Sequence, residues 1–536
     1  MNMRMRAALL ASALVAVVAL PAGAEGRAAG RSTGTSATVA PNSPNMSHVF
    51  NLRHRKGSPT GAQVAGGTDI EFTTMTVPVG DEAGEPVCVV DELGACVLDD
   101  DGNTVYQTQE RDFALAGTYQ NGLQIVDITE PEAPVTTGVY DCAISQGDVQ
   151  VFHRDGRTYV TYTSDNGYPV GQSSACVREA KALAMYGSSG YGTYIADITD
   201  PAAPVTVSFI GNPSGSHNQT VAPGGEYLYN SNSDIGVLDR LDPTDQTGRI
   251  EVYDIRDFAA PKQVATLPLL SGADSHDITF SADGKRAYTA ALTHTLVLDT
   301  TDLAAPKVIG RIVDPAVNIH HQSDPVTLKD ATTGMERTFL IVTDELAGAA
   351  GNAVCPGGGL HIYDITGPLE AAPVKVGFWN MPSARFTGTS NITCTSHVLR
   401  LHPDEKIMTI AWYNAGVRVV DISGLVGVSV GATEAGGNVG AGMREIGYHY
   451  FSNSDTWSAK TNRIEADGSF YLYGNDQARG LDVYRFDGSA QVAEDGGTWL
   501  TPKQALAQAR LRGANGTVTS GSGPYCLYRG RPLRVG

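Results

Sequence analysis

The fold is decided by residues 274–314, DSHDITFSADGKRAYTAALTHTLVLDTTDLAAPKVIGRIVD, the clearest copy of a unit that recurs along the chain. The unit contains four short apolar or alternating runs separated by turn-forming residues. Asp283-Gly284 suits the positive φ of a tight hairpin, and Pro306 cannot donate a hydrogen bond to a neighbouring strand. This pattern predicts a four-stranded antiparallel sheet.

The third run of this unit, Thr295–Asp299, recurs with little change and is usually followed by a Pro-containing turn. Its copies lie at residues 123–127, 193–197, 250–254, 295–299, 360–364, 417–421 and 481–485. Their spacing of about 45 to 70 residues is expected of four-stranded units that carry loop insertions. Sheets repeated in this way pack face to face around an axis, so the sequence predicts an all-β, seven-bladed β-propeller.

These repeats also resemble a known family. The sequence Leu-Gln-Ile-Val-Asp at residues 123–127, followed by Pro131 and Pro134, is similar to the strand and turn of the LVIVD-repeat β-propellers. The resemblance covers roughly residues 68–487. It implies a secreted or surface propeller but no shared reaction, because propellers host many activities. The seventh copy departs from the pattern, with Arg485 at the position of the repeated Asp.

The ends of the chain are expected to meet. The seventh copy lacks a fourth strand after Phe486, and residues 46–52 have the pattern of an outer strand. We expect this segment to complete the seventh blade, which removes an exposed sheet edge. The propeller then spans residues 45–488, after a disordered lead at 25–44. The extension at 489–536 contains a short helix, opened by Thr501-Pro502, and a tail.

The first residues have the features of a secretory signal. Arg4 and Arg6 precede an apolar run at residues 7–20, and Ala22-Gly23-Ala24 forms a small-residue cleavage site. The run is shorter than the ~20 residues that a membrane-spanning helix needs. We therefore expect cleavage after Ala24 and a secreted, extracellular protein without a transmembrane segment. A retained N-terminal anchor is the alternative.

The chain is acidic, with a formal net charge of −19. Such a charge favours solubility and opposes binding to anionic membranes and to nucleic acid, for which the sequence also has no basic patch. Nucleic acid is therefore not an expected partner.

Seven cysteines in an exported protein indicate disulfide bonds, and none of them forms a Cys-x-x-Cys zinc motif. The repeat register brings loops of one face together and favours specific pairs. The predicted pairs are Cys88–Cys96, Cys142–Cys176 and Cys355–Cys394, with Cys526 left over.

Histidines recur at one position of the repeat. Alignment of the first strands places His217, His276, His320 and His397 where the chain enters the innermost strand of four consecutive blades. Their side chains would form an arc around one mouth of the central channel. Imidazole binds divalent metal ions, so these four residues are candidate ligands for an ion of unknown identity. Further candidates are His321, Gln219 and Gln322.

Loops between second and third strands open on the same face and carry polar residues, among them Asp165, Asp344, Glu345 and Tyr413. Asp344 and Glu345 are candidate acid/base residues, and the imidazoles could form an acid/base cluster instead of a metal site. A third interpretation is structural, because repeat histidines often form hydrogen bonds within their own blade, as in WD-repeat proteins. Confinement to four neighbouring blades favours a functional arc.

Two functions compete. The first is a secreted binding module that presents its His-lined channel mouth to a glycan, a small molecule or a protein, with or without a divalent metal. The second is a metal-assisted extracellular hydrolase or polysaccharide lyase that uses the same His and carboxylate cluster. The sequence contains no nucleophile elbow, phosphate loop or dinucleotide fingerprint in a suitable strand-turn-helix context.

Overall fold

The computed structural model describes most of the chain between residues 41 and 488. The described ranges are 41–81, 85–165, 170–187, 190–212, 215–232, 248–270, 273–330, 332–345, 358–381, 394–428, 438–439, 441–488, 517–518 and 533–534. The predicted signal peptide, most of the lead and the expected helix at 501–511 lie outside these ranges, as do Cys355 and Cys526.

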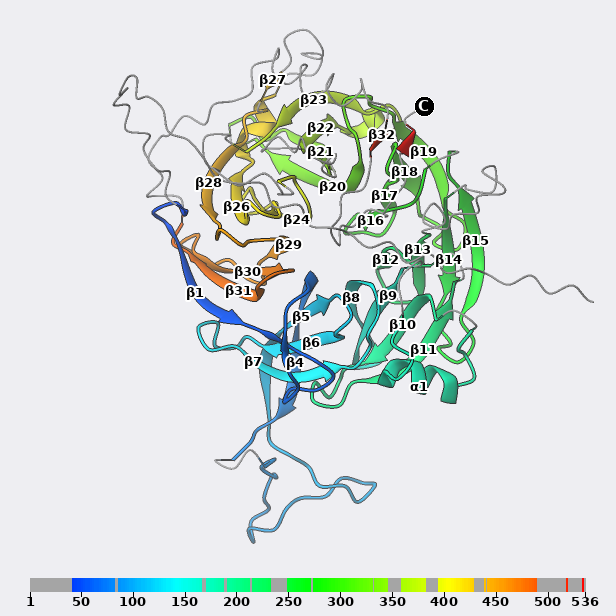
Figure 1. Ribbon diagram of the computed structural model, residues 1–536, viewed down its shortest axis with the longest axis vertical. Helices are drawn as coiled ribbons and strands as arrows, with labels where there is room; N and C mark the ends of the chain where they lie inside the picture. Colours follow the sequence, from blue (N-terminus) through cyan, green and yellow to red (C-terminus); the bar gives the residue numbers. More distant parts are fainter. Residues whose placement is uncertain are drawn as a thin grey trace, which may run out of the picture. The chain divides into compact units, whose positions relative to one another are not determined.

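Seven antiparallel sheets, each of four strands in its basic form, stand around one axis, as predicted (Figure 1). The strands of blades one to four are β4 (Gly67–Pro78), β5 (Thr108–Thr118), β6 (Leu123–Asp127), β7 (Val135–Tyr140), β8 (Gln146–Arg154), β9 (Arg157–Ser164), β10 (Gly192–Asp197), β11 (Val205–Gly211), β12 (Gln219–Val221), β13 (Tyr227–Ser231), β14 (Arg249–Asp254), β15 (Lys262–Pro268), β16 (Asp277–Phe280), β17 (Arg286–Ala290), β18 (Thr295–Asp299) and β19 (Lys307–Ile312).

The remaining three blades follow the same order from the axis outward. Their strands are β20 (His320–Lys329), β21 (Glu336–Asp344), β22 (Gly359–Asp364), β23 (Val374–Trp379), β24 (Leu399–His402), β25 (Ile407–Ala411), β26 (Val417–Asp421), β28 (Arg444–His449), β29 (Thr456–Lys460), β30 (Phe470–Asp476), β31 (Gly480–Phe486) and β1 (Met46–Leu52). A short strand, β27 (Asn438–Val439), adds a parallel fifth strand to blade five. Two small pairs complete the β-structure: β2 (His54–Arg55) with β3 (Gln63–Val64), and β32 (Thr517–Val518) with β33 (Leu533–Arg534).

The repeated Asp has a local structural reason. It ends the third strand, and its Oδ1 accepts a hydrogen bond from the backbone N–H two residues later. In blade one this bond runs from Thr129 to Asp127 at 3.0 Å, and in blade four from Thr301 to Asp299 at 3.0 Å. Such Asx turns redirect the chain toward the outer strand. In the seventh blade Arg485 takes this position, because the outer strand comes from elsewhere in the chain.

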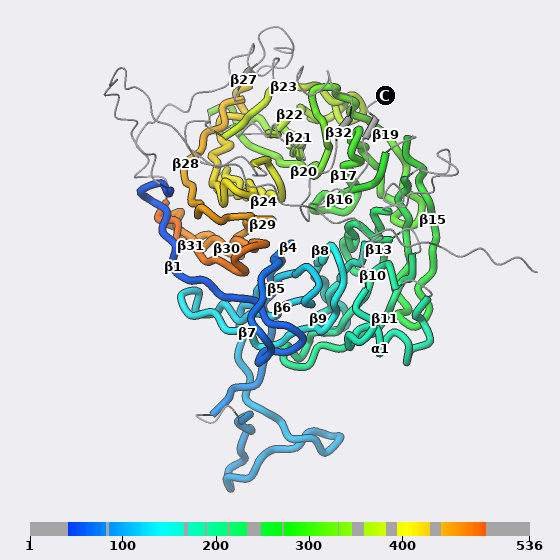
Figure 2. The backbone as a smooth tube through the Cα atoms, viewed as in Figure 1, coloured from blue at the N-terminus to red at the C-terminus, as the bar shows by residue number. Residues whose placement is uncertain are grey.

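That outer strand is β1, as expected from the sequence. β1 pairs antiparallel with β31 from Met46 opposite Phe486 to Leu52 opposite Leu481. Figure 2 shows the chain passing through the blades in order, with β1 lying against β31 from the other end of the propeller. The two ends of the repeat region thus close the ring by backbone hydrogen bonds and leave no open edge between the first and last blades.

Two of the predicted disulfides are present. Cys88–Cys96 closes a turn of the long insertion in blade one. Cys142–Cys176 ties the loop before blade two to α1 (Ala175–Ala182), the α-helix of the described residues, where Asp141 Oδ2 also accepts the Ala175 N–H at 2.9 Å. Cys394 is disulfide-bonded as well, and its expected partner Cys355 is outside the described ranges.

Apolar side chains fill the spaces between neighbouring blades. Trp379 of blade five and Trp412 of the sixth are both buried, with ring centroids 5.9 Å apart. Short 3-10 helices, η2 (Gly367–Ala371) and η4 (Ser423–Gly427), form part of the outer connections. Within the described ranges, the helices are too short or too polar to cross a membrane.

Shortening Met46 should test the closure of the ring. Its side chain is 1% exposed and packs in the core between blades six and seven with Ile446 and Phe486. We expect Met46→Ala to lower the free energy of unfolding by about 2–5 kcal/mol, the usual range for a buried Met→Ala change. The same change at Met335, which is 54% exposed, is the matched control and should have little effect. Equal urea midpoints for the two variants would contradict a structural role for β1.

Candidate metal centre

Four histidines converge on the propeller axis at one end of the inner strands. They are His217, His276, His321 and His397, from blades three to six, and each is at most 3% exposed. Neighbouring ring centroids lie 4.2, 4.3 and 4.2 Å apart in this order. The even spacing reflects the rotation from blade to blade, so residues distant in sequence become neighbours.

Three of the rings are held by their Nδ1 atoms, and the partners belong to a neighbouring blade. His217 Nδ1 lies 3.0 Å from Asp165 Oδ2 of blade two, and His276 Nδ1 lies 3.0 Å from the His321 carbonyl of blade five. His397 Nδ1 bonds the carbonyl of Trp457 in blade seven. Since carbonyl and carboxylate oxygens only accept, these Nδ1 atoms carry the protons. The rings of His217, His276 and His397 are thus fixed in tautomer and orientation across a blade boundary, whereas His321 Nδ1 contacts the Thr343 hydroxyl of its own blade at 3.4 Å.

With Nδ1 protonated, Nε2 of a neutral ring is a lone-pair donor, and these atoms face one another. His217 Nε2 and His276 Nε2 are 2.9 Å apart. Glu345, at the end of β21, lies beside them: its carboxylate oxygens are 3.9 Å from His321 Nε2 and 3.7 Å from His397 Nε2. Ligand atoms of His276, His321 and Glu345 all lie within 4.8 Å of one another. Among the residues that the structure describes, buried His321 Nε2 and Glu345 Oε2 have no hydrogen-bond partner.

The electrostatics of the cluster favour uncharged imidazoles. Burial and neighbouring histidines hold the pKa values of His276 and His321 well below the ordinary value, and burial lowers the pKa of His397 to about 3. Burial raises the pKa of Glu345 to about 8, although Tyr413 donates a hydrogen bond to its Oε1 at 2.6 Å. Neutral imidazole is the form that ligates metals, and a bound cation would favour the ionised carboxylate.

The structure differs from the sequence alignment at blade five. His321, and not His320, joins the arc. His320 Nδ1 instead contacts Thr295 Oγ1 at 2.8 Å, between blades four and five. Adjacent residues of a strand point to opposite sides, and a register irregularity between His320 and Ser323 shifts the start of β20 by one position. Two consecutive histidines therefore have different surroundings.

Three other candidates lie outside the arc. Asp344 accepts hydrogen bonds from the backbone N–H groups of Asn318 and Ile319, and its Oδ2 is 3.7 Å from His361 Nε2. Gln219 Nε2 bonds Thr161 Oγ1 and Asp148 Oδ2. Gln322 joins blades five and six through both backbone polar groups of Leu399. These side chains have structural partners, and Glu345 is the expected acid/base candidate that reaches the histidines.

A cavity of about 380 Å³ continues along the axis from the histidine cluster, and His321 forms part of its wall. Its other walls come mostly from the first strands: alternate residues in blades one to three, and the consecutive runs 277–282 and 398–401 in blades four and six. Five carboxylates and two cations line it: Asp69, Glu71, Asp148, Asp277, Asp324, Arg400 and Lys460. Sequence reasoning did not select these residues. The sequence signal that could have found them is the alternation of polar and apolar residues along a first strand, as in Asp69-Ile70-Glu71.

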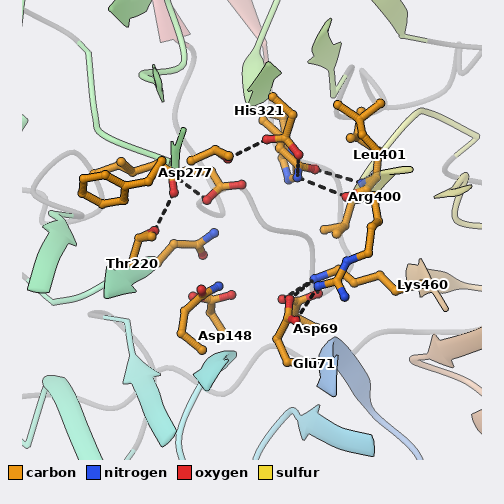
Figure 3. Close-up of a pocket in the computed structure, with 18 of the residues that line it drawn as sticks. Asp69, Glu71, Asp148, Thr220, Asp277, His321, Arg400, Leu401 and Lys460 are labelled. Carbon is orange, nitrogen blue, oxygen red and sulfur yellow. Dashed lines mark hydrogen bonds and ion pairs between the residues drawn. The ribbon is translucent and has the colours of Figure 1, made fainter. Parts of the chain in front are cut away.

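The charged residues divide into two groups around the cavity (Figure 3). On one side Lys460 Nζ lies 2.8 Å from Asp69 Oδ1 and 2.7 Å from Glu71 Oε1, and Arg400 also bonds Glu71. These two cations and two carboxylates balance one another. The cations of blades six and seven hold the pKa of Glu71 at about 2 against the effect of its burial.

The other group consists of Asp148, Asp277 and Asp324. None of the three has a salt bridge among the residues that the structure describes. Asp324 instead accepts hydrogen bonds from Thr279 Oγ1 at 2.5 Å and from Gln322 Nε2 at 3.0 Å. Burial without a salt-bridge partner raises the pKa of Asp324 to about 6. Burial together with nearby carboxylates holds the pKa of Asp148 well above its ordinary value.

Comparisons with known proteins assign neither a family nor an activity to the chain. No family model matches the chain, and no curated protein matches its sequence. A putative 6-phosphogluconolactonase from Bacteroides fragilis is 12% identical, with a TM-score of 0.41, and the match covers 69% of this chain and 92% of that chain. The periplasmic gluconolactonase of Pseudomonas aeruginosa is 14% identical, with a TM-score of 0.36 and coverages of 71% and 97%. Likenesses of this size carry no argument about activity.

The carboxylates without salt bridges predict that the free energy of unfolding depends on pH, and one part of this dependence can be assigned to Asp324. The folded-state pKa of Asp324, about 6, is above its ordinary value of 3.8, so the folded state binds this proton more tightly than the unfolded state does. The resulting contribution to the free energy of unfolding is complete below pH 3.8 and is lost as pH rises through 6. We expect Asp324→Asn to become more stable relative to wild type by up to about 2 kcal/mol between pH 4 and pH 7. Urea unfolding at both pH values measures this. A pH-independent difference would show that Asp324 titrates normally.

Proposed function

We propose that the axial histidine cluster binds one divalent transition-metal ion and makes this end of the channel a ligand-binding site. His217, His276, His321 and His397 would supply Nε2, and Glu345 would supply a carboxylate oxygen. The observation that carries the proposal is the convergence of ligand atoms from His276, His321 and Glu345, which all lie within 4.8 Å of one another, with His217 Nε2 at 2.9 Å from His276 Nε2. A cation or a shared proton between these groups would stabilise such an arrangement.

The distances support this interpretation. Two Nε2 atoms bound to one ion at about 2.0–2.1 Å can be no more than about 4.2 Å apart, and His217 and His276 meet that limit at 2.9 Å. The Nδ1 bonds to Asp165 and to backbone carbonyls are of the kind that orient metal-bound histidines. An imidazole-rich site with one carboxylate suits zinc, copper, iron or nickel better than magnesium or calcium.

We also propose that the protein is exported and belongs with the LVIVD-repeat propellers. The disulfides Cys88–Cys96 and Cys142–Cys176 support an oxidising compartment. The Asx turns after the third strands give the repeated Asp a structural role in this type of blade. The ligand of the site would be a glycan, a small molecule or a protein segment.

A metal-assisted hydrolase or lyase is the second candidate function. Two observations favour it over a purely structural ion. The axial cavity reaches His321, so one side of the cluster is open to a ligand, whereas structural metal sites are usually closed. Glu345 and the Tyr413 hydroxyl form a hydrogen-bonded pair beside the same histidines and could hold or move a proton there.

Adjacent histidines provide the test of the metal site. After loading with Zn²⁺ or Cu²⁺ and removal of free ion, we expect one equivalent of metal in wild type and a loss of at least about tenfold in affinity for His321→Ala, because a ligand is removed. His320→Ala is the matched control: it removes the neighbouring buried imidazole, which points away from the cluster, and should retain the metal. Elemental analysis and competition with a chelator measure both.

Circular dichroism and thermal unfolding of the metal-free variants show whether each is folded. A folded wild type without stoichiometric metal would exclude the metal centre. Equal loss of metal in folded His320→Ala and His321→Ala would place the ion elsewhere. Retention of metal by both variants would also contradict the assigned ligands.

A further inference from the structure

The axial cavity has an unbalanced charge that the metal centre does not explain. Its five carboxylates face two cations, so three negative charges remain when all are ionised. Arg400 and Lys460 are occupied by Glu71 and Asp69. The excess therefore belongs to Asp148, Asp277 and Asp324, which come from blades two, four and five.

We infer that this cavity binds a small organic cation with two amino groups, of the aliphatic diamine class. A buried carboxylate without a cationic partner is costly, and a ligand that brings positive charge removes that cost. The cavity, about 380 Å³, is within the size range of small-molecule sites. His321 belongs both to the histidine cluster and to the wall of this cavity.

The arrangement of the carboxylates favours an organic cation over a bound metal ion. Among the described residues, the group of ligand atoms close enough to share an ion is His276, His321 and Glu345, and the three Asp residues do not form such a group. One ion could not contact all three at normal metal–oxygen distances. Two ammonium groups joined by an alkyl chain can reach carboxylates on different blades.

The rest of the wall matches the other parts of such a ligand. Phe280, Pro325 and Leu401 line the cavity, are only partly buried and leave apolar surface for methylene groups. A ligand of neutral hydroxyl groups would use the amides of the wall but would leave the negative charges uncompensated. The negative charge of the wall therefore favours an amine over a neutral ligand.

The inference does not depend on the metal proposal, because the ammonium groups would contact the Asp side chains and not the histidines. We therefore propose to measure binding with metal-free full-length protein and again after metal loading. A failure of amine binding with normal metal content would reject this inference alone. A failure of metal binding with normal amine binding would reject the metal centre alone.

Isothermal titration calorimetry at low ionic strength, with 1,4-diaminobutane as the probe, tests the inference. We expect saturable binding of one equivalent, weaker binding of butylamine, and no binding of 1,4-butanediol, which has the same length without charge. Asp148→Asn and Asp324→Asn should each weaken binding of the diamine by about tenfold or more, since each removes a desolvated ion pair at nearly constant volume.

Asp283→Asn is the matched control. Asp283 lies in the turn between β16 and β17 with its side chain 59% exposed, and its replacement should leave diamine binding unchanged. Thermal unfolding confirms that each variant is folded, and both buried variants remove an uncompensated charge and so should fold at neutral pH. Equal binding of the diamine and the diol, no binding of the diamine by folded wild type, or unchanged binding in both buried variants would each overturn the inference.

Discussion

The burial of ionisable groups on the axis is the constraint that the rest of the structure must satisfy. The propeller brings the first strands of all seven blades together, and alternate residues of each strand point to the same narrow space. In such a space, charge must be neutralised by a partner, removed by protonation or balanced by a ligand. The apolar layers between the blades keep the strands close enough for this constraint to operate.

Different sectors of the ring satisfy the constraint differently. Blades one, six and seven use ion pairs between Asp69, Glu71, Arg400 and Lys460. At the end of the axis, blades three to six contribute neutral imidazoles, and His217, His276 and His397 donate their Nδ1 protons to adjacent blades. Asp148, Asp277 and Asp324 have neither arrangement, so a cationic ligand would be needed to balance them.

The repeat made the fold predictable, because the Asp that ends each third strand serves one local turn and survives insertions around it. The closing strand was predictable because a missing partner in the last blade matched a spare strand at the other end. The residues of the site were harder to predict from the sequence. His320 and His321 are both histidines, and which of them joins the cluster depends on a one-residue register irregularity at the start of β20. The acidic wall was not predicted because Asp148, Asp277 and Asp324 are single aspartates in three separate strands and form no linear motif.

Closure by β1 also has a consequence for synthesis. His48 of β1 bonds Asp482 across 434 positions of sequence, so the outer strand of the last blade is made among the first parts of the domain and its partner among the last. While the ribosome translates the intervening blades, β1 has an unpaired edge and the ring cannot be completed. Contacts this distant in sequence form slowly. The axial site therefore takes shape only after translation has passed the final blade, and a nascent chain would need protection of that edge until then.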